Sequence, residues 1–162
     1  MWLFKNDKKN CKISILLISD LHLNSFSKEL IENLKNKIEK LNPTIILLGG
    51  DYIDSKKCFV IFKEFLSFLR QRENIYAIKG NHDIFFGVNK IKNEVITNKV
   101  IWLDKTNESL NLGKFIIQIS NNSLDEIKEK TDFKILLEHY PKDMDITKNE
   151  FNIAFAGHLY GC

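Results

Sequence analysis

The sequence predicts an α/β fold built from layers of strands and helices. Apolar runs that read as strands alternate with amphipathic helical segments through about the first hundred residues. The strand candidates are continuous apolar runs rather than alternating patterns, which is typical of strands buried on both faces. A length of 162 residues suits one domain with its own hydrophobic core, so we expect a single domain over residues 1–162.

The first strand and helix are indicated by a change of hydrophobic period. The run "ISILLIS" at 13–19 predicts a buried strand, whereas the leucines and isoleucines of 27–41 recur at helical spacing. Ser27 is the expected N-cap of this helix, and Pro43 follows its end. This pair forms the first strand–helix unit of the layered fold.

The same alternation continues along the chain. A second strand at 44–48 ends in "GGD", a largely buried helix is expected at 58–70, and a third strand at 75–78 ends in "KGNHD". The remaining expected elements are helices at 88–96 and 123–130, and strands at 100–103, 114–120, 133–138 and 151–156. Strand–helix–strand crossovers of this kind are right-handed.

The charge balance gives little support for nucleic-acid binding. The chain has 24 basic and 21 acidic residues, a net charge of +3, and its lysines are scattered. A field this weak does not argue for a polyanionic partner. Scattered lysines are typical of solvated helix faces.

Cysteine usage and hydropathy predict a cytoplasmic protein without a membrane span. Cys11, Cys58 and Cys162 are odd in number, widely spaced and lack a C-x-x-C pair, which disfavours a disulfide framework or a zinc knuckle. The apolar start "MWLF" is interrupted after four residues, and no later window approaches eighteen apolar residues without a charge.

Polar residues that can bind metals follow five of the predicted strands. In open α/β sheets, binding sites form at the carboxyl ends of strands. All four histidines of the chain lie at such ends. The residues concerned are Asp20 and His22 in "SDLH", Asp51 and Asp54 in "GGDYID", Asn81 and His82 in "GNHD", His139 in "EHYP", and His158 in "GHLY".

Each group alone has an ordinary structural explanation, but together they predict a metal site. Asp20 suits a turn or cap, the glycines of "GGD" suit a tight turn, "GNHD" also suits a turn, and His139 suits a structural role. Their shared position favours a cage of carboxylate oxygens and imidazole nitrogens, a donor set that suits Mn, Fe or Zn.

Two ions about 3.5–4 Å apart need a shared carboxylate, which an aspartate on a glycine turn at a strand end is well placed to supply. Such a pair lowers the pKa of a bridging water and holds two phosphate oxygens, so that the hydroxide attacks phosphorus in line. A nearby histidine then protonates the leaving oxygen.

The ordered motifs resemble those of the calcineurin-like metallophosphoesterases, a family of binuclear metallophosphatases. The family pattern D-x-H, G-D, G-N-H-[D/E], an isolated histidine and G-H-x-H corresponds here to "DLH" at 20–22, "GD" at 50–51, "GNHD" at 80–83, His139 and "GHLY" at 157–160. The resemblance covers nearly the whole chain and implies a layered β-sandwich flanked by helices. The "GGDYID" form is most similar to the bacterial phosphodiesterase-like branch.

The resemblance also implies roles for individual residues. Asp20 and His22 would hold the first metal ion, and Asp51 would bridge both ions. The second ion would be completed by Asn81, His139 and His158. His82 would act on the scissile phosphate as acid or transition-state stabiliser. Asp54 and Asp83 would orient histidines or backbone.

The sequence departs from the family pattern in two places. The second histidine of G-H-x-H is replaced by Tyr160, whose neutral phenol is a poor ligand for a divalent ion, so a weakened first site is expected. The chain ends at Cys162, short of the strands with which the family usually continues, so a fold lacking those C-terminal strands is expected. A natural truncation, a frameshifted product and a divergent minimal form all stay open.

The leading hypothesis is a phosphoesterase that uses two divalent metal ions and a metal-bridging hydroxide to hydrolyse a phosphodiester or pyrophosphate bond in a small substrate. The alternative is a degenerate or truncated member that binds one metal ion or a phosphate ligand with little catalysis. A nuclease is disfavoured by the modest charge. A Rossmann-type nucleotide binder is disfavoured because no G-x-G-x-x-G follows the first strand.

Overall fold

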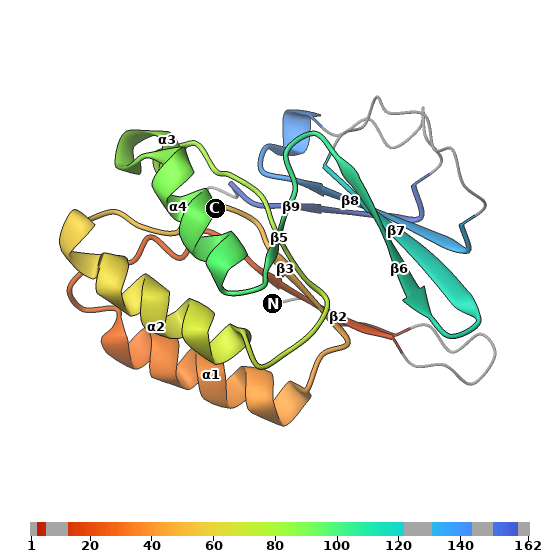
Figure 1. Cartoon of the computed structure of the whole chain (residues 1–162), viewed down its shortest axis with the longest axis horizontal. Coiled ribbons are helices and arrows are strands. Elements are labelled where there is room, and N and C mark those ends of the chain that lie inside the picture. Colours follow the sequence, from red (N-terminus) through yellow and green to blue (C-terminus); the bar gives the residue numbers. More distant parts are fainter. Residues whose placement is uncertain (1–2, 6–12, 122–130, 144–150, 159–162) are drawn as a thin grey trace.

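The computed structural model describes residues 3–5, 13–121, 131–143 and 151–158. It contains two β-sheets stacked face to face, with helices on the outer side of the first sheet (Figure 1). The expected α/β layered sandwich flanked by helices is therefore confirmed.

The first sheet has the strand order β1-β2-β3-β4-β5. Its strands are β1 Leu3–Lys5, β2 Ser14–Ile18, β3 Ile45–Leu48, β4 Ile75–Ala77 and β5 Ile101–Trp102. Strands β2 to β5 run parallel, and β1 pairs antiparallel with β2. The parallel strands therefore present their carboxyl ends at one edge of the sheet.

The second sheet has the order β6-β7-β8-β9, with strands β6 Asn107–Leu112, β7 Phe115–Ser120, β8 Phe133–Glu138 and β9 Ile153–Ala156. Strands β7, β8 and β9 are parallel, and β6 pairs antiparallel with β7. This sheet also gathers the carboxyl ends of its parallel strands at one edge.

Helices cover the outer face of the first sheet. They are α1 Lys28–Leu41, α2 Phe59–Leu69 and α4 Val88–Thr97, with the short α3 His82–Phe86 between α2 and α4. Among the described residues, the 3-10 turns η2 Lys56–Cys58 and η3 Pro141–Asp143 lie in connections. None of the helices in the described part of the chain combines the length and apolar character needed to cross a bilayer.

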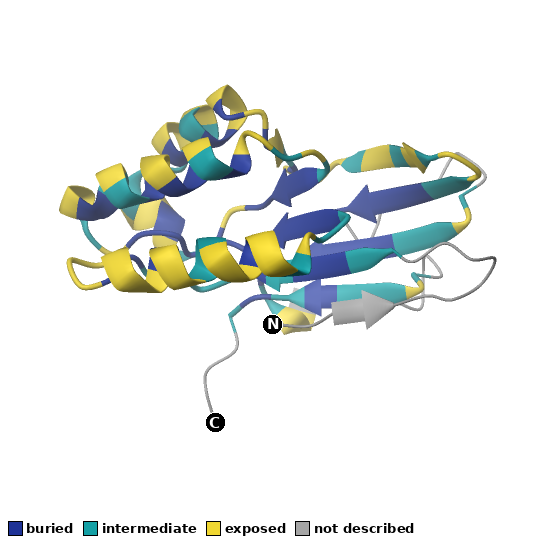
Figure 2. Cartoon of the chain, turned by 90° about the horizontal axis from the view of Figure 1, so that it is seen from below, coloured by how far each residue is buried: buried dark blue, intermediate teal, exposed yellow. Residues whose placement is uncertain are grey.

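Two hydrophobic cores hold the layers together, one on each face of the first sheet. Both cores contain residues of the same strands, because successive side chains in a strand face opposite sides of the sheet. In β3, Ile46 and Leu48 pack with the helices, whereas Ile45 and Leu47 pack against the second sheet. Figure 2 shows that the strands are largely buried, whereas the outer faces of the helices are exposed. Continuous apolar strands follow from burial on both faces.

The structure corrects several local expectations. Ser27 stands at the N-cap position of α1 but makes no capping hydrogen bond there; its Oγ instead accepts one from the Asn24 N–H, at 3.0 Å. "GNHD" continues into the helix α3 rather than forming only a turn, and strand β6 was not predicted. The helix expected at 123–130 lies outside the described residues.

Candidate metal centre

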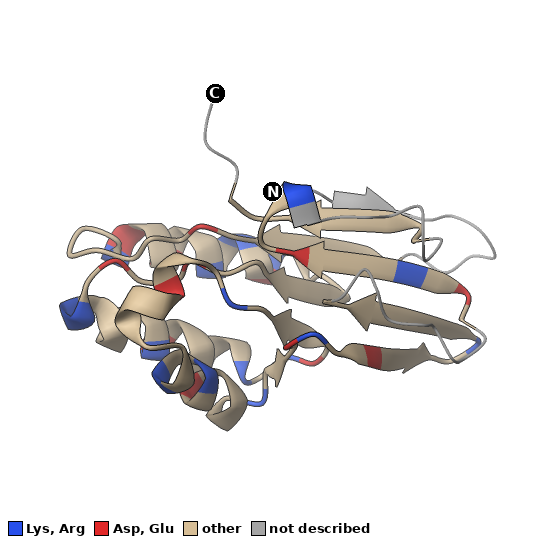
Figure 3. Ribbon diagram, turned by 90° about the horizontal axis from the view of Figure 1, so that it is seen from above, with Lys and Arg blue, Asp and Glu red and all other residues tan. Residues whose placement is uncertain are grey.

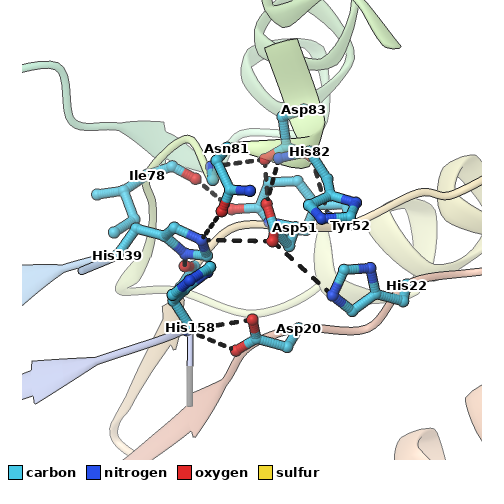
Figure 4. A network of polar contacts seen from close by, with 12 residues as sticks. Asp20, His22, Asp51, Tyr52, Ile78, Asn81, His82, Asp83, His139 and His158 are labelled. Carbon is cyan, nitrogen blue, oxygen red and sulfur yellow. Dashed lines mark hydrogen bonds and ion pairs between the residues drawn. The ribbon is translucent and has the colours of Figure 1, made fainter. Parts of the chain in front are cut away.

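The carboxyl ends of strands from both sheets converge on one cluster of polar side chains (Figure 4). Backbone hydrogen bonds join the loops that follow β2 and β3: the Asp20 N–H donates to the Gly50 carbonyl at 3.1 Å, and the His22 N–H donates to the Asp51 carbonyl at 3.0 Å. Further along, Leu23 forms a parallel bridge with Ile53. The two loops therefore extend the pairing of their strands and hold their polar side chains side by side.

Several site residues have a left-handed backbone that non-glycine residues rarely adopt. Among the described residues, four of the eight non-glycine residues with positive φ belong to this cluster. They are Asp20 at 54°, His22 at 43°, Asp51 at 56° and His158 at 49°. Each such conformation costs on the order of 1–2 kcal/mol. Concentration of this strain in one cluster indicates a functional site rather than a set of ordinary turns.

Asp51 lies at the centre of the cluster and is 1% exposed. Its Oδ1 accepts a hydrogen bond from the His82 backbone N–H at 2.8 Å, which fixes the carboxylate. Its Oδ2 lies 3.8 Å from His22 Nε2 and 3.4 Å from His139 Nε2. One carboxylate oxygen thus lies between imidazole nitrogens that belong to different strand ends.

The ring of His139 is oriented by hydrogen-bond partners on both of its nitrogen atoms. Nδ1 lies 2.7 Å from the Gly49 carbonyl oxygen, which can only accept, so Nδ1 carries a proton. Nε2 lies 2.8 Å from Asn81 Oδ1 and 3.4 Å from Asp51 Oδ2. In this tautomer the Nε2 lone pair faces two oxygen atoms, so the three atoms together could bind a cation. This donor set fits a metal ion held by nitrogen and oxygen.

His22 follows the same pattern on the other side of Asp51. Its Nδ1 lies 2.7 Å from Asp54 Oδ1, which orients the ring so that Nε2 faces Asp51. Burial by itself lowers the pKa of His22, but the hydrogen bond and charge of Asp54, with the charges of two further carboxylates, outweigh burial and raise it. In the metal-free protein, His22 therefore binds a proton more readily than an ordinary histidine.

His82 is the accessible histidine beside this pair. Its side chain is 48% exposed, and its Nδ1 lies 3.6 Å from Asp54 Oδ1. The rings of His82 and His22 make an edge contact with a centroid distance of 4.7 Å. Asp54 therefore contacts both histidines, in keeping with the orienting role expected for it.

Asp20 and His158 meet although they are separated by most of the chain. The His158 backbone N–H donates to both oxygens of the Asp20 carboxylate, at 3.1 and 3.0 Å. This contact attaches the end of β9 to the end of β2. The ring of His158 lies 5.2 Å from that of His139, centroid to centroid.

Two glycines allow the strand ends to approach so closely. A Cβ on Gly157 would lie 2.3 Å from Ser19 Oγ and 2.8 Å from the Gly49 carbonyl oxygen. A Cβ on Gly80 would lie 2.0 Å from Asp51 Oδ1. These positions therefore exclude any side chain, because real Cβ atoms do not approach other atoms so closely.

Asp83 supports the site through hydrogen bonds to the backbone of neighbouring loops. It is fully buried and accepts hydrogen bonds from the backbone N–H groups of Asp51, Tyr52 and Gly80, at 3.0, 3.0 and 2.7 Å. Burial raises the pKa of Asp83, and the three hydrogen bonds oppose that rise. The expected role of Asp83 in orienting backbone agrees with these contacts.

The structure brings all the predicted ligands together but groups some of them differently. Donor atoms of Asp20, Asp51, His139 and His158 all lie within 4.8 Å of one another, and the same holds for His22, Asp51 and His82. Asp20 thus lies nearer the expected second-site residues, and His82 has the geometry of a ligand as well as of an acid. Tyr160 lies outside the described residues.

Sequence reasoning missed the role of backbone groups in this centre. The Gly49 carbonyl fixes His139, and the His82 N–H fixes Asp51. Any residue type can supply a backbone carbonyl or N–H group, so the sequence could have pointed to these contacts only through their position at strand ends.

Comparison with protein families gives one match that covers most of the chain. The family model of the calcineurin-like phosphoesterases matches residues 13–162. No curated protein matches the chain.

Several solved structures share the fold at low sequence identity. A putative 5'-nucleotidase from Staphylococcus aureus aligns with a TM-score of 0.64 and 13% identity, over 90% of this chain and 45% of the other. The NAD nucleotidase of Haemophilus influenzae aligns with a TM-score of 0.58 and 18% identity, over 93% and 39%. The sulfate thiohydrolase SoxB of Thermus thermophilus aligns at 0.51 and 10%, over 81% and 33%. The chain therefore spans less than half the length of these structures.

Proposed function

Because the chain belongs to the calcineurin-like phosphoesterase family, we propose that it is a metal-dependent hydrolase that cleaves a phosphodiester or pyrophosphate bond in a small substrate. The observation that carries the proposal is the position of Asp51 Oδ2 between the Nε2 atoms of His22 and His139. A buried carboxylate between inward-facing imidazoles suits a ligand shared by two cations.

The residues divide into two sets of ligands that share Asp51. By the family pattern, Asp20 and His22 would hold one ion with Asp51, and Asn81, His139 and His158 would hold the other. In the structure, a carboxylate oxygen of Asp20 also lies within 4.8 Å of donor atoms of His139 and His158, so Asp20 stands close to the second set. Mn, Fe and Zn all suit these oxygen and nitrogen donors. When bound, such a pair of ions lowers the pKa of water and neutralises charge on the phosphate oxygens.

His82 would supply the proton that the leaving group needs. Hydrolysis forms one bond from a water oxygen to phosphorus and breaks the bond from phosphorus to the leaving oxygen, which must gain a proton. His82 is the most exposed imidazole of the cluster, and Asp54 forms a hydrogen bond with His22 and contacts His82 at 3.6 Å. Asp54 would thus position the proton donor and one ligand together.

The two similar structures named as nucleotidases make nucleotides reasonable test substrates beside simple aryl diesters. The dispersed charge of the chain, visible in Figure 3, favours such small molecules over nucleic acid.

The test is turnover by purified protein supplied in turn with Mn, Fe and Zn. We expect hydrolysis of bis(4-nitrophenyl) phosphate, lost in Asp51→Asn and kept in Glu39→Gln, which removes an exposed carboxylate near the far end of α1. No turnover of any phosphoester with any of these ions would refute a hydrolase.

A second candidate is a family member that binds one metal ion or a phosphate with little catalysis. Tyr160, in place of the second histidine of G-H-x-H, favours it. Binding of one ion per chain, with turnover appearing only in Tyr160→His, would support this candidate over the first.

A further inference from the structure

Phe85 is a large apolar side chain that lies beside the proposed proton donor. It is 85% exposed, and its ring makes an edge contact with His82 at a centroid distance of 6.3 Å. Single exposed apolar residues are common on protein surfaces, so exposure alone identifies nothing. The contact with His82 is what connects Phe85 to the site.

The short helix α3 holds Phe85 in this position from both sides. Before Phe85, the fully buried Asp83 binds three backbone N–H groups. After it, the ring of Phe86 stacks on Phe59 at 5.6 Å, with the Lys90 ammonium 4.3 Å from the Phe59 ring centroid. The contacts of Asp83 and Phe86 therefore fix the backbone of α3 on either side of Phe85, whose side chain stays exposed.

Helical spacing places Phe85 over the same surface as His82. The two residues are three positions apart in α3, so their side chains lie on one face of the helix. Figure 1 shows α3 at the edge of the molecule, beyond the ends of the first-sheet strands. The exposed rings of His82 and Phe85 therefore lie next to each other on one face of α3.

We propose that Phe85 determines leaving-group specificity by packing against a flat aromatic ring attached to the leaving oxygen. The inference rests on the proposed function, because His82 must face that oxygen. An aromatic ring gains from offset or edge-to-face contact with phenylalanine beyond the burial of its area, whereas an aliphatic group gains only the burial. The favoured substrate class is therefore phosphodiesters with an aromatic leaving group.

The test compares two methyl phosphodiesters that differ only in the leaving group. One carries phenol, and the other carries hexafluoroisopropanol, an alcohol of similar acidity that is not planar. We expect wild-type protein to prefer the phenyl ester in kcat/KM, and Phe85→Ala to reduce this preference by about two- to tenfold. Phe85→Tyr, which keeps the ring, should retain the preference.

Phe26 offers a matched control. It is 90% exposed and follows His22 by four residues, but among the described residues no ring contact joins it to His82. Phe26→Ala removes a similar apolar area from the surface and should leave the ratio of the two esters unchanged.

A binding measurement supplies a readout that does not need turnover. Calorimetry should show tighter binding of phenylphosphonate than of methylphosphonate, and Phe85→Ala should lose most of that difference. An unchanged ester ratio in an active Phe85→Ala protein, or an equal loss for both esters, overturns the inference alone. A wild-type protein that hydrolyses other phosphoesters but neither of these two also overturns the inference alone. Absence of turnover with every phosphoester refutes the proposed function, and the inference falls with it.

Discussion

Replacing Asp83 by alanine is expected to destabilise the fold severely while removing no predicted ligand. The carboxylate is fully buried and accepts hydrogen bonds from three backbone N–H groups, those of Asp51, Tyr52 and Gly80. A buried donor left without a partner costs about 1–3 kcal/mol. Three such donors give roughly 3–9 kcal/mol, and we expect about 3–5 kcal/mol because water can enter the space. That is a large part of a domain's typical stability of about 5–15 kcal/mol.

Asparagine at the same position should cost less, because part of the network survives. The N–H groups of Asp51 and Gly80 both donate to Oδ2, so an amide oxygen placed there can keep both bonds. The amide NH₂ then faces the Tyr52 N–H, which leaves one donor unsatisfied at about 1–3 kcal/mol. The expected order of stability is wild type, then Asp83→Asn, then Asp83→Ala.

Urea unfolding followed by circular dichroism measures this order, with Glu39→Gln as the control for loss of an exposed carboxylate. Asp83→Asn should also lower metal affinity, since the Asp51 backbone loses charge-assisted support. If Asp83→Ala unfolds within about 1 kcal/mol of wild type, the three contacts do not support the site as described.

Three further perturbations test the geometry of the centre. Gly80→Ala should lower both stability and metal affinity, because its Cβ would lie 2.0 Å from Asp51 Oδ1; normal metal binding by this variant would contradict the close approach. His82→Ala should reduce turnover with metal content nearly unchanged, as measured by steady-state kinetics beside elemental analysis; loss of metal would make His82 a ligand instead. The raised pKa of His22 means that its interaction with Asp54 stabilises metal-free protein fully below about pH 6.5 and is lost as pH rises through the raised value. The difference in unfolding free energy between wild type and His22→Ala should therefore shrink from pH 6 to pH 8, and a constant difference would refute the pairing.

The buried parallel strands could be predicted from the sequence because each is a continuous apolar run between polar ends. β3 shows this directly, since all four of its residues are buried. The edge strand β6 could not be found in the same way. Its residues Glu108 and Ser109 are exposed, and only Leu110 and Leu112 are apolar within "NESLNL". Its pairing with β7 depends on tertiary structure rather than on its own hydrophobicity.

The residues of the centre could be predicted from their positions at strand ends, but their contacts could not. The Asp20 carboxylate binds the His158 N–H across 138 positions of sequence, and no local pattern encodes that distance. Likewise, "GNHD" reads as a turn until Asp83 is seen to bind backbone of another loop and hold α3. Both the Asp20–His158 contact and the Asp83 contacts depend on how distant segments of the chain pack together in the fold.

Metal content tests the central claim most directly. Protein purified without added ions, then exposed to Mn, Fe or Zn and desalted, is analysed by mass spectrometry beside Asp51→Asn and Glu39→Gln. A carboxylate shared by both ions predicts close to two ions per chain in wild type and Glu39→Gln, with both ions lost in Asp51→Asn. Wild-type protein that retains no ion, or Asp51→Asn that retains two, would contradict the shared-carboxylate centre.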